Sequence, residues 1–170
     1  MDENVAVIVD FHWLHDDDGN NIVKELSVMD VTRFAFRHWI LKPPSYVCVT
    51  DPKQTQTNRW LTRYYHGISW YDGETPYEDL VNILAKHVCG YKYVFVKGLE
   101  KKQLIHKYII HNCVKNLEDF DCPRITLLPK IHGTACLRHC DNNIMCTNHR
   151  VHALREWMMN EYRILLFLIN

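Results

Sequence analysis

The stretch HGTACLRHCDNNIMCTNH, residues 132–149, organises the chain. Three of the seven cysteines and three of the eleven histidines fall within it. Cys136 and His139 are three residues apart, about one helical turn, and Cys146 follows seven residues later. Thiolate and imidazole groups at this spacing suit a tetrahedral zinc ion. Residues 132–149 are therefore predicted to form a zinc-binding segment.

The spacing leaves the fourth zinc ligand open. His149 lies three residues after Cys146 and would complete a local site. A distant residue could equally close a site of three local ligands. The same pattern also fits a cluster of buried thiols with surface histidines, because free cysteine is often simply buried.

Length and composition predict one globular domain spanning residues 1–170. Hydrophobic residues make up 47% of the chain, and the formal net charge is zero. A neutral chain has no global field that attracts nucleic acid, so RNA contact would need a local basic patch. The acidic N-terminus carries no signal peptide, and no apolar run is long enough for a membrane span. We therefore expect an intracellular protein with reduced thiols, no membrane contact and no evident small-molecule substrate.

The order of apolar runs predicts an α/β fold with a mixed central sheet of about five strands flanked by helices. Extended segments are expected at residues 5–9, 22–28, 33–41, 46–49, 91–96 and 114–117. Helices are expected at residues 54–65, 77–87, 100–110 and 147–162. Glu25 would sit in the second strand, where a glutamate usually faces solvent.

Several short motifs in this order resemble a divergent DnaQ-type, RNase H-like exonuclease fold. They are Val9-Asp10-Phe11, the Lys24-Glu25 pair in the second strand, His66-Gly67-Ile68-x-Trp70, the run from Val96 to Lys102, and Asp121-Cys122-Pro123. Together with Cys136-x2-His139-x6-Cys146 they are similar to the Maelstrom domain and to small stand-alone arthropod proteins. The resemblance covers roughly residues 5–160, and its individual motifs are short.

The resemblance implies a specific zinc site. In Maelstrom domains the catalytic carboxylates are replaced by a Glu, Cys, His, Cys set that binds zinc. Carried over to this chain, the ligands are Glu25, Cys136, His139 and Cys146. Such an ion would join the second strand to the last helix and contribute folding free energy.

The carboxylates of an active exonuclease are largely missing. The first motif, Asp-x-Glu, here reads Asp10-Phe11-His12, and lysines follow where a later aspartate would stand, leaving only Glu100. Two-metal hydrolysis needs clustered carboxylates, so we expect a domain without the usual nuclease activity. The alternative is a metal-dependent nuclease for single-stranded RNA or DNA that uses Asp10, His12 and Glu100.

A local basic and aromatic surface would suit single-stranded RNA. Its candidate phosphate contacts are Arg59, Arg63, Lys97, Lys101 and Lys102, with Tyr64 and Tyr65 as aromatic neighbours. The same residues fit an ordinary solvated helix face and core. A protein partner bound by the apolar residues 164–169 is a further possibility. By resemblance, the role would be in small-RNA silencing.

Overall fold

A mixed five-stranded sheet forms the centre of the structure, a computed structural model that describes residues 4–139, 145–161 and 164. Its strands lie in the order β3-β2-β1-β4-β5. Their bounds are Ala6–His15 for β1, Asn21–Asp30 for β2, Phe36–Ile40 for β3, Tyr93–Val96 for β4 and Val114–Asn116 for β5. The first three strands pair antiparallel, whereas β4 and β5 run parallel to β1. The expected α/β class with a mixed sheet is therefore confirmed.

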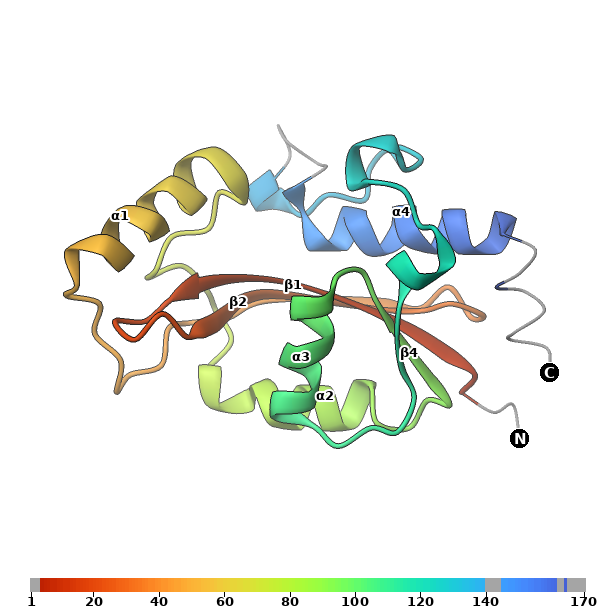
Figure 1. Cartoon of the computed structure of the whole chain (residues 1–170), viewed down its shortest axis with the longest axis horizontal. Helices are drawn as coiled ribbons and strands as arrows, with labels where there is room; N and C mark the ends of the chain where they lie inside the picture. Colours follow the sequence, from red (N-terminus) through yellow and green to blue (C-terminus); the bar gives the residue numbers. More distant parts are fainter. Residues whose placement is uncertain (1–3, 140–144, 162–163, 165–170) are drawn as a thin grey trace.

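Helices cover both faces of this sheet (Figure 1). The α-helices are α1 (Pro52–Trp60), α2 (Leu80–His87), α3 (Leu99–Tyr108) and α4 (Thr147–Asn160). A π-helix, η1 (Leu61–Tyr65), continues α1, and 3-10 turns include η3 (Leu117–Phe120), η4 (Ile125–Leu127) and η5 (Leu137–His139). Helices α2 and α3 lie on one face, while α1 and α4 lie on the other.

Alternation along β1 explains the two hydrophobic layers. Successive strand side chains point to opposite faces. Val7 and Val9 therefore pack with Leu84 and Ile105 from α2 and α3. Ile8 packs instead with Leu154 and other apolar residues of α4. The central strand is buried on both sides, which explains its nearly continuous apolar run.

Two expected extended segments differ from the structure. Residues 46–49 form a turn and loop instead of a strand, because a tight turn follows Pro43-Pro44, with the Val47 amide donating to the Pro44 carbonyl. The third strand begins only at Phe36, since Asp30 accepts hydrogen bonds from the turn at Thr32 and Arg33. The first residues of the predicted strand therefore belong to the turn.

No helix among the described residues is long and apolar enough to cross a membrane. Of the apolar residues 164–169, only Ile164 is described, and it is buried with Leu154 and Met158. The remaining five residues lie outside the described part of the chain, as does Cys140.

A buried lysine ties the loop after η1 to the sheet. Lys24 on β2 is fully buried, and its ammonium donates to the carbonyls of Leu41, Trp70 and Asp72 at 2.6, 2.7 and 2.7 Å. Burial lowers the pKa of Lys24 to about 8. Three carbonyl acceptors offset the cost of burying the charge and fix residues 70–72 beside the edge of the sheet.

We expect Lys24→Met to lower the free energy of unfolding by roughly 3 to 5 kcal/mol, because it leaves three carbonyl oxygens without their donor. Urea unfolding followed by tryptophan fluorescence measures the change. The same substitution at the exposed Lys42 is the control, with an expected change below about 0.5 kcal/mol. Equal stability of the two variants would contradict a clamp at Lys24.

Candidate metal centre and adjoining cleft

Four potential metal ligands converge beneath the start of α4. They come from separate parts of the chain. Glu25 lies on β2, His38 lies on β3, Cys136 lies in the loop before η5, and Cys146 directly precedes α4. One ligand atom from each lies within 4.8 Å of all the others. The register explains two of them, because His38 pairs with Ser27 and is therefore a diagonal neighbour of Glu25 on the same face.

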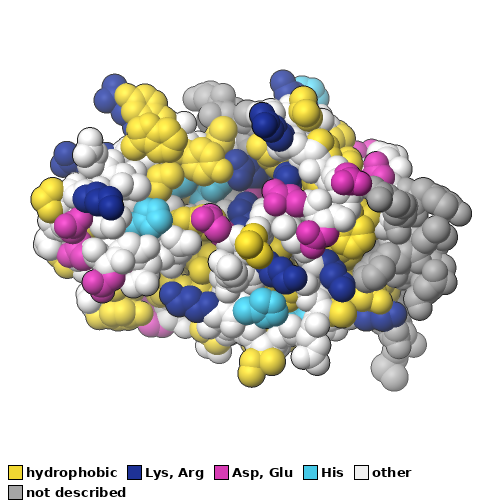
Figure 2. All heavy atoms as spheres, viewed as in Figure 1, with side chains coloured by type: hydrophobic (Ala, Val, Ile, Leu, Met, Phe, Trp, Pro, Cys, Tyr) yellow, Lys and Arg dark blue, Asp and Glu magenta, His cyan; other side chains and the backbone are white. Residues whose placement is uncertain are grey.

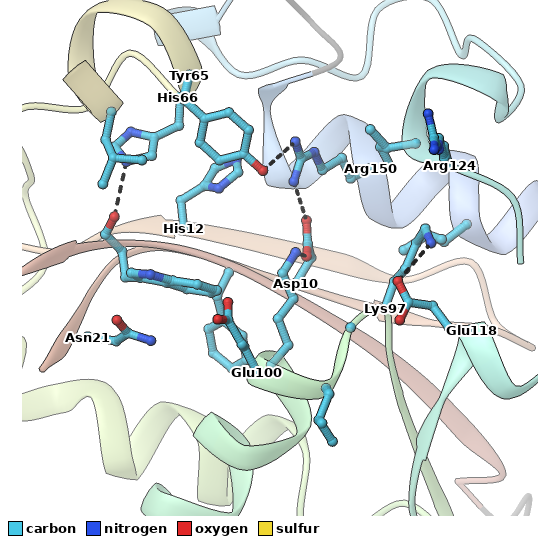
Figure 3. Close-up of a pocket in the computed structure, with 18 of the residues that line it drawn as sticks. Asp10, His12, Asn21, Tyr65, His66, Lys97, Glu100, Glu118, Arg124 and Arg150 are labelled. Atoms are coloured by element: carbon cyan, nitrogen blue, oxygen red, sulfur yellow. Dashed lines mark hydrogen bonds and ion pairs between the residues drawn. The ribbon is translucent and has the colours of Figure 1, made fainter. Parts of the chain in front are cut away.

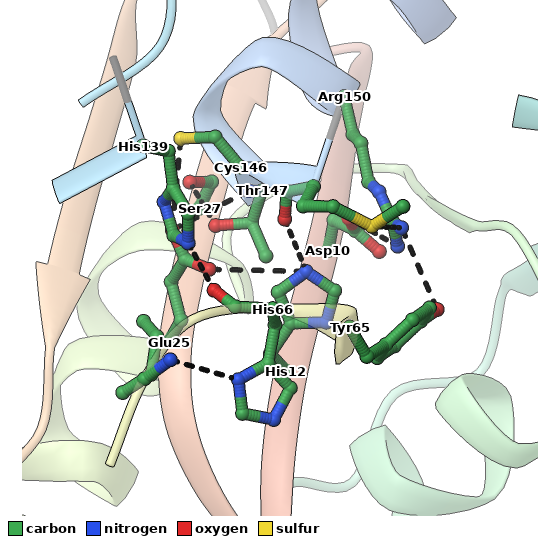
Figure 4. A network of polar contacts seen from close by, with 12 residues as sticks. Asp10, His12, Glu25, Ser27, Tyr65, His66, His139, Cys146, Thr147 and Arg150 are labelled. Carbon is green, nitrogen blue, oxygen red and sulfur yellow. Dashed lines mark hydrogen bonds and ion pairs between the residues drawn. The ribbon is translucent and has the colours of Figure 1, made fainter. Parts of the chain in front are cut away.

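His139 adjoins the same group. Its Nδ1 lies 3.1 Å from the Cys136 sulfur and 3.5 Å from Glu25 Oε1. Its Nε2 contacts the backbone carbonyl of His66 (Figure 4). A histidine that ligates a metal through one ring nitrogen usually donates its other N–H to such an acceptor. The structure therefore brings three of the predicted ligands, Glu25, Cys136 and Cys146, together with His38. It places the fourth, His139, beside this group, next to Cys136 and Glu25.

His149 has a different environment. Its Nδ1 lies 2.8 Å from the Thr134 hydroxyl and 3.1 Å from the Ile131 carbonyl. These contacts direct the ring to the loop at residues 131–134. The local alternative that used His149 as fourth ligand is not the arrangement that this structure has.

Glu25 is fully buried, contrary to the solvent-facing position that is usual for a strand glutamate. Oε1 lies 2.7 Å from His38 Nε2 and 3.6 Å from the Cys146 sulfur. Oε2 has no hydrogen-bond partner among the described residues. An unsatisfied buried carboxylate oxygen is costly, and a bound cation would relieve that cost.

The protonation preferences also favour positive charge in the centre. The hydrogen bond with Cys146 lowers the pKa of the Cys136 thiol, and the same contact raises that of Cys146. Burial alone would lower the pKa of His38, but its contacts with Cys136 and Glu25 outweigh this and raise it to about 9. The centre therefore favours a thiolate at Cys136 and a protonated His38, and the donor set fits a metal ion.

A cleft of about 690 Å³ adjoins this centre, between the end of η1 and the first turn of α3. It is visible as a hollow with acidic, basic and histidine side chains at its rim (Figure 2). Its polar lining comes mostly from β1, η1, α3, η3, α4 and the connections between them (Figure 3). The cationic side chains that line it are Lys97, Lys101, Arg124 and Arg150, and the carboxylates are Asp10, Glu100 and Glu118.

Asp10 occupies the middle of this cleft wall and is buried. Its Oδ1 forms an ion pair with the ammonium of Lys101, and its Oδ2 lies 4.0 Å from the Arg150 guanidinium. Arg150 also lies 3.5 Å from the Tyr65 hydroxyl. Glu118 is likewise paired, with Lys97 at 3.3 Å. Two protein cations therefore compensate the carboxylate at the centre of the cleft.

Two stacked histidines form the floor between the cleft and the metal centre. The rings of His12 and His66 are 5.1 Å apart and inclined by 29°. Burial lowers the pKa of His12 well below its usual value and that of His66 to about 4. His66 Nδ1 accepts from the Ile68 amide, so its Nε2–H donates to the Trp13 carbonyl. Both rings are neutral near pH 7.

The predicted RNA-contacting residues separate into two places. Lys97 and Lys101 line the cleft, whereas Arg59 and Arg63 lie on α1 and η1, and Lys102 does not line the cleft. Lys101 was predicted as a phosphate contact, with a solvated helix face as the alternative, and it pairs instead with the buried carboxylate of Asp10. Arg124, Arg150 and His38 were missed by the sequence reasoning. Arg150 falls on the helix that follows the zinc motif, and that position is the only signal that pointed to it.

Comparison with known protein families and with curated proteins finds no match to this chain.

We expect Lys101→Met to lower the free energy of unfolding by about 3 kcal/mol, because it leaves the Asp10 carboxylate buried with only Arg150 nearby. Adding Asp10→Asn should recover much of the loss, since a neutral amide needs no counter-ion. Urea unfolding of the two single variants and the double variant measures the coupling. Lys102→Met, one residue along α3, is the matched control, and simple additivity at positions 10 and 101 would contradict the buried pair.

Proposed function

We propose that the chain is a divergent DnaQ-type, RNase H-like domain, similar to the Maelstrom domain, that binds RNA without cleaving it. The strand order, with β1 between an antiparallel hairpin and a parallel β4, supports this fold. So does the place of Asp10 on the central strand. A role in small-RNA silencing inside the cell follows from the resemblance and is part of the proposal.

The metal in this proposal is zinc, and its role is structural. Thiolate and imidazole donors favour zinc over magnesium or calcium. Four protein ligands leave no open position for a substrate or water. We assign Glu25, Cys136, His139 and Cys146 as the ligands. His38 is then the outer partner that holds Glu25, because its Nε2 bonds to Oε1 of that carboxylate at 2.7 Å.

One observation is the main support for a binding role instead of a catalytic one. The buried carboxylate of Asp10 is compensated by Lys101 and Arg150, where a two-metal nuclease holds divalent cations. Glu118 is paired with Lys97 as well. Among the described cleft residues, this leaves Glu100 as the carboxylate for which no ion pair is recorded.

The cations of the same cleft support RNA as the ligand. Arg124 is exposed, and it faces the hollow together with Lys97 and Arg150 (Figure 3). Guanidinium groups recognise phosphate through fixed, paired donors. Because the net charge of the chain is zero, such a local group is the form that nucleic-acid attraction would take here.

The second candidate function is a metal-dependent nuclease acting on single-stranded RNA or DNA. It is favoured by Asp10 Oδ2, which is buried without a hydrogen-bond partner among the described residues. His12 and Glu100 would be its neighbours in a degenerate site. Cleavage of labelled single-stranded RNA with Mn²⁺ or Mg²⁺, lost in Asp10→Asn, would establish this function and refute the non-catalytic one.

Zinc content separates the roles of the three histidines. We expect one zinc per chain in the wild type, loss of most zinc in His139→Gln, and retention in His149→Gln, the control for a histidine outside the centre. His38→Gln should keep the ion but bind it about 10 to 100 times more weakly. Elemental analysis and competition with a chelator measure both quantities.

Three results would contradict this assignment in different ways. Zinc lost in His38→Gln and kept in His139→Gln would exchange the roles of the two rings. Zinc lost only in His149→Gln would indicate a local site. A wild-type protein without zinc would refute the metal altogether.

RNA binding should depend on salt and on the cleft. We expect labelled single-stranded RNA to bind more weakly at 200 mM than at 50 mM KCl, because bound phosphates release counterions. Arg124→Gln should reduce the slope of log affinity against log salt by about one. Lys86→Gln, on α2 across the sheet, is the control with the same charge change. Absence of binding at 50 mM KCl would refute the proposal.

A further inference from the structure

Helix α1 and the π-helix η1 carry large aromatic side chains that the fold does not use for packing. Asn58 is the only side chain of residues 52–65 that is buried. Trp60 is 54% exposed and Tyr64 is 62% exposed. Their ring centroids lie 6.2 Å apart. Exposed aromatic groups on a helix that buries so little are typical of a binding surface.

The charged residues of the segment that carries these rings are all positive. Residues 52–65 contain Lys53, Arg59 and Arg63 and no acidic residue. The Arg63 guanidinium lies 5.3 Å from the centre of the Tyr64 ring. Cations placed beside aromatic rings match a ligand that alternates phosphate groups with flat bases.

Tyr65 links this surface to the cleft. Its ring lines the cleft, meets His12 edge-on at 5.4 Å, and lies 5.6 Å from the Arg150 guanidinium. Figures 3 and 4 show its hydroxyl directed to Arg150. Tyr65 therefore directly follows the aromatic surface of Trp60 and Tyr64 in the sequence and contacts Arg150 in the cleft. A π-helix at this point, Leu61–Tyr65, is a feature that often marks functional sites.

We propose that Trp60 and Tyr64 form a base-stacking platform for single-stranded RNA whose phosphates continue into the cleft beside Tyr65. This inference rests on the RNA-binding function proposed above and narrows its ligand. Bases inside a duplex are already stacked on one another, so a side-chain platform selects unpaired strands.

The test uses a short single-stranded RNA with 2-aminopurine at successive positions, whose fluorescence reports stacking, and fluorescence anisotropy for affinity. Trp60→Ala and Tyr64→Ala should each weaken binding about 5- to 150-fold and abolish the 2-aminopurine response at one position. Trp60→Phe and Tyr64→Phe should retain most of both signals. A duplex of the same sequence should bind more weakly than the single strand and should not respond to these substitutions.

Tyr46→Ala is the matched control. Tyr46 is 78% exposed and lies near Tyr77 and Tyr108, which pack against the layer of α2 and α3. The Tyr46→Ala substitution should leave the affinity for RNA unchanged.

The outcomes separate the two proposals. If wild-type protein binds no RNA at low salt, both are overturned. If single-stranded RNA binds and depends on Arg124, but Trp60→Ala and Tyr64→Ala bind as the wild type does, only the platform is overturned. Equal affinity for duplex and single strand would also overturn the platform.

Discussion

The carboxylate of Glu25 sets the main constraint on this structure. It sits in the middle of β2 with no exposed surface. Its neighbours are two cysteines and three histidines, which come from β1, β3, the loop before η5, η5 itself and the residue before α4. A charge in that position is stable only if opposite charge is held against it. The loop at residues 131–139 and the first turn of α4 are thereby fixed over the hairpin, and with them the position of every side chain that α4 directs into the cleft.

The face of the sheet beneath α4 is divided along its length. Near the start of the helix, the side chains of the strands that face it are Asp10, His12, Glu25 and Ser27. Thr147 of the helix bonds to Ser27, and Arg150 lies beside Asp10. Nearer its end the same strands present Ile8 and Met29 to Leu154 and Met158. The apolar half contributes burial that does not depend on exact position. The polar half allows α4 only one position along the sheet, because each charged group has a partner at a defined place. One helix thus closes the core and builds both sites.

Much of the fold was predictable from the sequence because it depends on local patterns. The apolar run at residues 5–9 and the turn residues that follow place the central strand and the hairpin. The stretch at residues 132–149 supplies Cys136, His139 and Cys146 as candidate ligands, whereas Glu25 was named only through the family resemblance. The contacts made across the sheet were not predictable in the same way. His38 reaches Glu25 only through the register of β3 on β2, and nothing in residues 33–41 states that register. The ion pair of Lys101, which was predicted as a phosphate contact or a solvated helix residue, could not be foreseen, because its partner Asp10 lies 91 residues earlier. The loop at residues 46–49 was misread because apolar content alone does not distinguish a strand from a packed turn.

The separation of the candidate metal ligands along the chain has a consequence for synthesis. Glu25 and Cys146 are 121 residues apart, so the ribosome releases the strand long before it releases the second thiol. Until Cys146 is released, the strands can neutralise the Glu25 carboxylate only with the nearby histidines. Capture of the proposed zinc ion would therefore be one of the last events in the maturation of the chain. A translation product truncated before residue 136 would lack both thiols, and quality-control proteases would meet it with its sheet uncovered on the face where α4 belongs.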